Sequence, residues 1–245
     1  LKNGVREYQA FIANQIRIKK MIQEEYGVPL MYENAIGFSG LEWLFNYIRG
    51  IKGLSIDLRR RPDEVKATSD AISARTMNRY ENNPNAYVGH STSAVFDYYI
   101  CMLAHSILNP KQFEIYYMPW LRYMGEMAEK WDKTLFIFQE ASSDRFWDML
   151  SELPANRFCI YSEQDDIFDQ KKRLTNMTPG GGMPQVLMGN GTPQECVDYA
   201  KKLIDEIGCD GKYVFGINKM ISFPNDVRKE NLIAVNEFVY DYKMN

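Results

Sequence analysis

The residues best suited to chemistry follow short apolar runs, at the points where each run turns polar. Carboxylates, a histidine, phenols, amides and an amine occupy these points, and such groups carry out proton transfer and bind hydroxyl-rich ligands. In chain order they are Tyr32, Asn34, His90, Gln139, Glu140, Tyr161, Glu163, Asp166, Asn218 and Lys219. Because the carboxyl ends of parallel strands meet at one edge of a sheet, we expect these side chains to converge on one mouth.

His90 is one of two histidines and comes directly after a glycine at the end of an apolar run. It is predicted to act as a general acid or base or as a metal ligand. The alternative is a histidine held by hydrogen bonds at the rim. The other histidine, His105, lies in the stretch "YYICMLAHSIL" (98–108), which is predicted to be helical, and is expected to be structural.

Glu140 and Glu163 end neighbouring predicted strands. Two carboxylates that face one cavity can share acid–base work or bind a metal, since each changes the pKa of the other. The alternative is that each pairs with a lysine or arginine at the rim. Asp165 and Asp166 follow at once, so this loop favours a cation or a hydroxyl-rich ligand.

The stretch "TPGGGMPQVLMGNGTP" (178–193) holds two glycine clusters. It lacks the Lys-Ser or Lys-Thr that follows the glycines of a P-loop. It also does not lie between the first strand and its helix, where the glycines of a dinucleotide-binding fingerprint stand. Gly180 to Gly182 are therefore predicted to form a flexible rim after a short strand, with Gly181, Gly182 and Met183 near the substrate. The second cluster precedes a helix with a Thr192–Glu195 capping box and Pro193 in its first turn.

Short apolar runs alternate with longer amphipathic stretches, which is typical of βα units around a parallel sheet. Amphipathic helices are predicted at the N-terminus, from Asn109-Pro110 with a break at Pro119, and over 193–207. The economical interpretation is one barrel-like α/β domain over residues 1–245. Strands are predicted over 28–34, 86–92, 134–140, 157–163, 174–179 and 212–218.

The composition limits the classes of function. A net charge of −3 in 245 residues argues against a nucleic-acid binder, and the run Arg59 to Arg61 is predicted to be a solvated turn neutralised by nearby acids. Four scattered cysteines form no CxxC pair, so we expect reduced thiols, a cytoplasmic location and no structural zinc site. No membrane span or signal peptide is predicted. The chain starts without Met, and natural residues are expected to precede Leu1.

Several segments resemble the uroporphyrinogen decarboxylase-like superfamily, which includes methyltransferases that act on corrinoid proteins. They are "SGLEWLFNYIRGIKGLSIDLRRRPDEV", "LNPKQFEIYYMPWLRYM", "SEQDDIFDQKKRL", "GTPQECVDYAKKLIDEIG" and "KYVFGINKMISFPNDVRKENLIAVNEFVYDY", in the family's order over nearly the whole chain. The resemblance implies a (β/α)8 TIM barrel, of which this chain carries roughly strands 3 to 8. It also implies a funnel-shaped site at the C-terminal face.

In the thiol-directed methyltransferases the resemblance implies a zinc ion held by a His-x-Cys pair and a later cysteine. This chain departs from that pattern, because Phe138 and Glu140 stand at the His-x-Cys positions, and Asn218 and Lys219 stand near the later cysteine. No metal ligands are therefore predicted.

The resemblance implies a methyltransferase that moves a methyl group from a small methylated substrate towards a corrinoid protein. His90, Glu140 and Glu163 are the predicted catalytic residues, and the remaining strand-end residues, with Gly181 to Met183, are predicted to bind substrate. The alternatives are a tetrapyrrole-type decarboxylase (a carboxy-lyase) and a non-catalytic barrel that binds a corrinoid protein. A corrinoid carried by a partner and a homodimer are further expectations.

Overall fold

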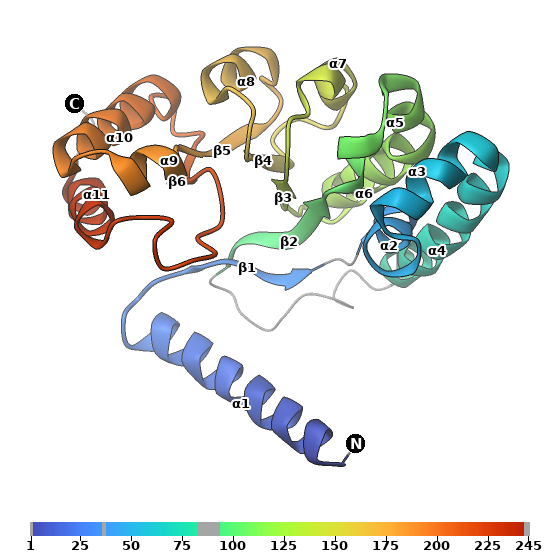
Figure 1. Ribbon diagram of the computed structural model, residues 1–245, viewed down its shortest axis with the longest axis horizontal. Helices are drawn as coiled ribbons and strands as arrows, with labels where there is room; N and C mark the ends of the chain where they lie inside the picture. Colours follow the sequence, from blue (N-terminus) through green and yellow to red (C-terminus); the bar gives the residue numbers. More distant parts are fainter. Residues whose placement is uncertain (1, 36–37, 83–93, 243–245) are drawn as a thin grey trace.

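A parallel sheet forms the centre of the computed structural model, which describes residues 2–35, 38–82 and 94–242. Its strands follow one another in chain order, so each pairs with the next one along the sequence. Figure 1 shows a curled sheet with helices along its convex side, an arrangement that matches part of a TIM-like barrel. The strands are β1 (Leu30–Ala35), β2 (Ala94–Met102), β3 (Leu135–Gln139), β4 (Phe158–Ser162), β5 (Thr178–Met183) and β6 (Val214–Ile217).

The helices cover the outer face of this sheet, apart from the first one. They are α1 (Lys2–Glu24), α2 (Gly40–Trp43), η1 (Leu44–Ile48), α3 (Gly50–Arg60), α4 (Pro62–Asn82), η2 (Ala104–Ile107), α5 (Pro110–Tyr116), α6 (Met118–Lys130), η3 (Asp144–Phe146), α7 (Trp147–Leu150), α8 (Ile167–Arg173), α9 (Gln185–Asn190), α10 (Pro193–Ile207) and α11 (Lys229–Asp241).

The capping signals in the sequence are confirmed. Thr192 and Glu195 form the predicted capping box of α10, and Asn109 caps α5 with Gln112 as its partner. The chain ends α5 at Tyr116 and restarts as α6 around Pro119, as the missing N–H of a proline requires.

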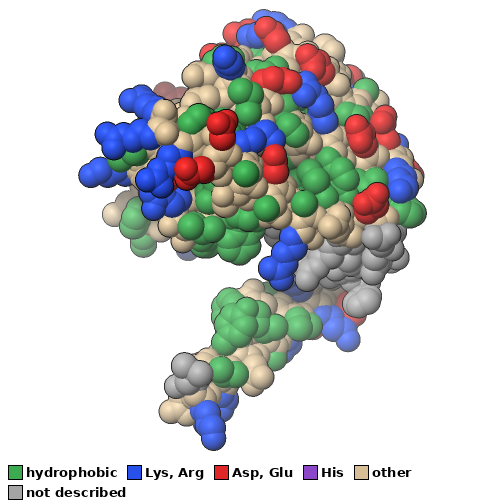
Figure 2. All heavy atoms as spheres, turned by 90° about the vertical axis from the view of Figure 1, so that its right-hand side faces the viewer, with side chains coloured by type: hydrophobic (Ala, Val, Ile, Leu, Met, Phe, Trp, Pro, Cys, Tyr) green, Lys and Arg blue, Asp and Glu red, His purple; other side chains and the backbone are tan. Residues whose placement is uncertain are grey.

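Helix α1 confirms the amphipathic helix predicted at the N-terminus. None of its described side chains is buried, and several large apolar ones are exposed. It stands apart from the rest of the protein, with apolar side chains visible along it (Figure 2).

Four strand predictions agree with β1, β3, β4 and β6 to within a few residues. The strand predicted over 86–92 lies outside the described residues. The helix predicted over 98–108 is wrong, because β2 extends through residue 102 and only the short η2 follows. Burial alternates along β2, with Tyr98, Ile100 and Met102 buried and their neighbours partly exposed, which is the period-two pattern of a strand.

The strand predicted over 174–179 is found further along the chain, as β5. The prediction that Gly180 to Gly182 form a flexible rim after this strand is therefore wrong. Gly180 to Gly182 are inside β5, with positive φ angles of 84° at Gly181 and 90° at Gly182. The ring of Tyr161 lies against them: a Cβ on Gly180 would come within 2.8 Å of the Tyr161 Cδ2 atom. These glycines therefore admit a buried aromatic ring and an unusual backbone conformation.

The sheet divides the hydrophobic core into separate clusters of buried side chains. The largest cluster fills the space between strands β2 to β4 and the helices from α2 to α7, and a second cluster lies beneath α10 and α11. A third cluster, with Phe96, Phe136 and Cys159 at its centre, lies on the inner, concave face. This inner cluster forms the floor of the candidate site.

Gly40 sets how closely α2 approaches α4. A Cβ at this position would lie 1.9 Å from the Ser69 backbone oxygen, while the Gly40 N–H donates to the Ser73 hydroxyl at 2.8 Å. Because the obstacle is backbone, Gly40→Ala is expected to lower the free energy of unfolding by about 2–3 kcal/mol. Urea denaturation followed by circular dichroism measures this loss.

Gly53→Ala in α3 is the matched control, since the nearest atom to its Cβ would be the Arg49 Cβ at 3.4 Å. The better helix propensity of alanine is expected to stabilise this variant by roughly 0.5–1 kcal/mol. Equal stability of the two variants would contradict the close approach of α2 and α4.

Candidate active site

An aromatic hollow of about 380 Å³ opens on the concave face of the sheet. Tyr32 of β1 stacks on Tyr99 of β2 with ring centroids 4.4 Å apart, and on Phe136 of β3 at 5.7 Å. Such stacked rings present a largely apolar wall with hydroxyl groups at its edge. The full lining comprises Met31, Tyr32, Tyr99, Phe136, Phe138, Tyr161, Ile217, Lys219, Met220 and Ile221.

Tyr161 joins the hollow to the glycine-rich strands. Its hydroxyl donates to the Ile217 carbonyl, and its ring occupies the space left by Gly216 and Gly180. Burial raises the pKa of Tyr161 and of Tyr99, so both phenols are neutral at physiological pH. The hollow therefore offers hydroxyl groups but no phenolate.

Glu163 pairs with a lysine at the rim of the hollow, which is the alternative that the sequence analysis left open for this residue. Its Oε1 forms an ion pair with the Lys219 Nζ at 3.2 Å, and its Oε2 accepts from the Ala141 N–H at 3.0 Å. The Glu163 side chain is only 13% exposed. This carboxylate thus fixes the loop after β3 to the loop after β6.

Glu140 differs from Glu163, because its side chain is exposed and forms no ion pair with any residue in 2–35, 38–82 or 94–242. It follows directly after β3, and besides burial its charge is among the causes that raise the pKa of Tyr99, which lines the hollow. Its charge acts on Cys101: burial first, then the charges of Glu42 and Glu140, raise the pKa of the Cys101 thiol to about 11. Glu140 is thus a free carboxylate beside the hollow.

The remaining predicted residues are spread around this site. Gln139 is buried and turned away, donating to the Asp165 Oδ2 at 2.7 Å. Asp166 caps α8 by accepting from the Phe168 N–H at 2.8 Å, and Asn218 bridges the Gln185 N–H and the Glu163 carbonyl. Met183 is buried among the helices on the outer side of the sheet.

Only part of the predicted site is therefore brought together. Tyr32, Tyr161 and Lys219 line the hollow, and Glu140 and Glu163 lie at its rim. Asn34 is placed within β1, while His90 lies outside the described residues. Gly181 and Gly182 contribute only backbone to β5. Gly181 lies against the ring of Tyr161, and Gly182 lies beside Ile167.

Tyr99, Cys101 and Phe136 are site residues that the sequence prediction missed. Tyr99 and Cys101 were assigned to a helix, which has no inner sheet face. The unbroken run of aromatic and apolar residues from Tyr98 to Met102, which also fits a strand covered on both faces, was the available signal.

The zinc site of the thiol-directed family does not fit this chain. Phe138 contributes only its ring to the hollow, and a phenyl ring carries no atom that can ligate zinc. Among the residues that the structure describes, no three His, Cys, Asp or Glu side chains are grouped so that they could hold a metal ion.

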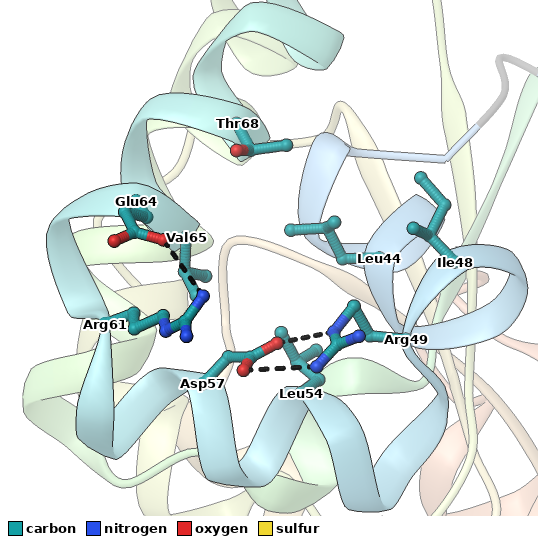
Figure 3. Close-up of a pocket in the computed structure, with 9 residues that line it drawn as sticks. All are labelled: Leu44, Ile48, Arg49, Leu54, Asp57, Arg61, Glu64, Val65 and Thr68. Atoms are coloured by element: carbon teal, nitrogen blue, oxygen red, sulfur yellow. Dashed lines mark hydrogen bonds and ion pairs between the residues drawn. The ribbon is translucent and has the colours of Figure 1, made fainter.

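A second hollow, between α3 and α4, is chemically different. Arg49 pairs with Asp57 and Arg61 pairs with Glu64 across it (Figure 3). Its charges thus neutralise each other in pairs, and it lies on the outer helices, away from the strand ends.

His105 is fully buried behind the strand ends, and neither ring nitrogen has a hydrogen-bond partner among the described residues. Burial, and then the charge of Arg145, lower its pKa to about 4. A folded-state pKa below the unfolded value of 6.5 means that stability is full above pH 6.5 and is lost as the pH falls towards 4. We expect a loss of about 2 kcal/mol between pH 7 and pH 5.

Urea unfolding at the two pH values measures this dependence, and His105→Leu is the control because it removes the titrating group. The variant is expected to lose about 2 kcal/mol less than the wild type between pH 7 and pH 5. An unchanged difference would show that other groups carry the acid sensitivity.

The described helices, in residues 2–35, 38–82 and 94–242, are each too short or too polar to span a lipid bilayer.

Comparison with known proteins identifies a similar fold. No protein-family model and no curated protein matches the chain. Among solved structures, a methyltransferase from Methanosarcina mazei matches with a TM-score of 0.59 and 14% sequence identity, over 90% of this chain and 62% of that one. At this identity the match concerns the fold alone. The chain therefore shares the α/β fold of that methyltransferase over less than two thirds of its length.

Proposed function

We propose that the protein is a methyltransferase that moves a methyl group from a small methylated substrate towards a corrinoid protein. The observation that carries the proposal is an aromatic hollow on the concave face of a parallel sheet, with the carboxylate of Glu140 close enough for its charge to act on Tyr99 of that hollow. The fold shared with a methyltransferase supports it. In this proposal the chain contributes strands to a (β/α)8 barrel and forms one domain.

The hollow suits the methyl-bearing end of a small substrate. The stacked rings of Tyr32, Tyr99 and Phe136 provide an apolar wall, and burial of a methyl group against such a wall excludes water from it. The Glu163–Lys219 ion pair closes the rim with no net charge. Substrate selection would therefore rest on shape and on the tyrosine hydroxyls.

Glu140 would pass a proton taken up from solvent to the heteroatom that loses the methyl group. The carbon–heteroatom bond breaks with its electron pair on the heteroatom, and the proton from Glu140 completes that valence. The corrinoid carried by the partner protein would supply the nucleophile that accepts the methyl group. Glu163 would act by holding the two rim loops in place.

Methyl transfer to free cob(I)alamin tests the proposal. The purified protein is mixed with cob(I)alamin and, separately, with methanol, methylamines, dimethyl sulfide and methoxylated aromatic compounds. Loss of the cob(I)alamin absorbance with one of these compounds is the expected result. No reaction with any of them, combined with tight binding to a corrinoid protein, would instead support the non-catalytic alternative.

A further inference from the structure

A polar cavity of about 550 Å³ lies outside the sheet, between α3, the start of α5 and the segment after β3. The side chains of its wall that matter here are Ser55, Arg59, Ser106, Asn109, Gln112 and Arg145. Ser106 and Asn109 follow β2, and Arg145 follows β3, so the cavity lies beyond the carboxyl ends of these two strands. We call it the rim cavity.

Arg145 brings an uncompensated positive charge to the rim cavity. Its guanidinium donates to the carbonyls of His105 at 2.9 Å, Ser142 at 3.1 Å and Leu108 at 3.3 Å, and lies 4.3 Å from the Phe146 ring. These partners are neutral, and Arg145 forms no ion pair with any described residue. The carbonyl bonds fix the guanidinium in place without cancelling its charge.

Arg59 brings the second charge. It was predicted to lie in a turn neutralised by acids, but it lies in the last turn of α3 and, within the described residues, forms no ion pair. No described aspartate or glutamate lines the rim cavity. The hollow between α3 and α4 shows the contrast, because both of its arginines are paired with carboxylates (Figure 3).

Asn109 and Gln112 add two hydrogen-bond donors. In the capping box of α5 the Asn109 Oδ1 accepts from the Gln112 N–H, and the Gln112 Oε1 accepts from the Asn109 N–H. Both amide oxygens are thereby used, so each side chain has only its NH₂ group left to offer. Neither NH₂ group has a partner among the described residues.

We propose that the rim cavity binds the phosphate group of a small phosphorylated molecule. Two guanidinium groups match the charge of a phosphate dianion: Arg59 can offer a planar pair of N–H groups to its oxygens, and Arg145, whose N–H groups mostly bond to carbonyls, adds its charge. The amide donors of Asn109 and Gln112 complete the ring of donors. The volume exceeds that of a bare ion and falls within the range of small-molecule sites, so an organic group has room beside the phosphate.

Isothermal titration calorimetry at fixed ionic strength tests the proposal with inorganic phosphate, glycerol 3-phosphate and acetate. We expect glycerol 3-phosphate to bind more tightly than inorganic phosphate, and acetate to bind at least about tenfold more weakly than either, since it has one charge and fewer oxygens. Acetate that binds as tightly as the phosphates would overturn the assignment. Inorganic phosphate that binds more tightly than its ester would also overturn it, by showing that the extra volume takes no organic group.

Arg59→Ala is the decisive variant, because the Arg59 side chain is exposed and forms no hydrogen bond or ion pair within the described part of the chain. It is expected to weaken binding of glycerol 3-phosphate at least about tenfold. Arg60→Ala is the matched control: it removes the same charge from the same helix, but Arg60 does not line the cavity. Equal weakening in the two variants would show a general charge effect and overturn the proposal.

Discussion

Glu42→Ala is expected to lower the free energy of unfolding by roughly 3–5 kcal/mol, because it leaves several buried donors without an acceptor. Glu42 is fully buried, and its Oε1 accepts from the N–H groups of Leu103 and Ala104 at 2.7 Å each and from the Tyr117 hydroxyl. Its Oε2 accepts from the Asn46 Nδ2 at 2.9 Å. The carboxylate thus ties α2 to the end of β2, the strand that carries Tyr99 and Cys101.

Glu42→Gln is the matched control, since one amide oxygen can still accept from Leu103, Ala104 and Tyr117. Its loss is expected to be about 1 kcal/mol at pH 7. Urea denaturation of both variants measures the difference. A loss below about 1 kcal/mol for Glu42→Ala would mean that the donors find other partners, and would contradict this role.

The pH dependence of the two proteins separates charge from hydrogen bonding. Burial raises the pKa of Glu42 above its usual value of 4.5, although its hydrogen bonds act in the opposite direction. A raised folded-state pKa means that the contribution of Glu42 is full below the unfolded pKa and is lost as the pH rises through the folded pKa. The advantage of wild type over Glu42→Gln is therefore expected to be larger at pH 4 than at pH 7.

Local signals in the sequence correctly predicted the helices whose ends are marked by capping residues. The capping box of Thr192 and Glu195 needs only residues three positions apart, and α10 begins where it predicts. The anchoring of β2 by Glu42 was beyond such reasoning, since its partners lie 61 to 75 residues away along the chain. Contacts between residues this far apart determine that Glu42 is buried. The local spacing of apolar residues carries no information about such contacts.

The sequence predicted that several polar residues converge because parallel strands end at a common edge, and Tyr32, Tyr161 and Lys219 do line one hollow. The details of the site depended on which side of β3 each residue faces. Phe136 and Phe138 face inward, while Gln139 faces the helices and hydrogen-bonds to Asp165. Strict application of the two-residue period would have assigned Gln139 to the outer side.

Glu140→Gln is expected to lower kcat for methyl transfer by roughly 10²–10⁴-fold, the usual contribution of a positioned general acid. The amide keeps the shape of the side chain but is not acidic enough to protonate the leaving heteroatom. Because Glu140 is exposed and makes no ion pair within the described residues, its substitution is expected to leave the urea midpoint unchanged. Initial rates of cob(I)alamin consumption over a range of substrate concentrations give kcat and KM separately.

Glu129→Gln, an exposed carboxylate at the end of α6, is the control for the loss of one negative charge. A fall of less than about threefold in kcat for Glu140→Gln would contradict its role as the acid. A rise in KM with kcat unchanged would instead assign Glu140 to substrate binding.

Cys101→Ser decides whether the neighbouring thiol takes part in the reaction. A nucleophilic cysteine must be a thiolate, and burial together with the charges of Glu42 and Glu140 raises the pKa of Cys101 to about 11. The thiol is therefore neutral at physiological pH, and the serine variant is expected to keep kcat within about twofold of the wild type. A fall as large as that of Glu140→Gln would place the chemistry on the thiol, and Glu140 would then act through its charge on Cys101.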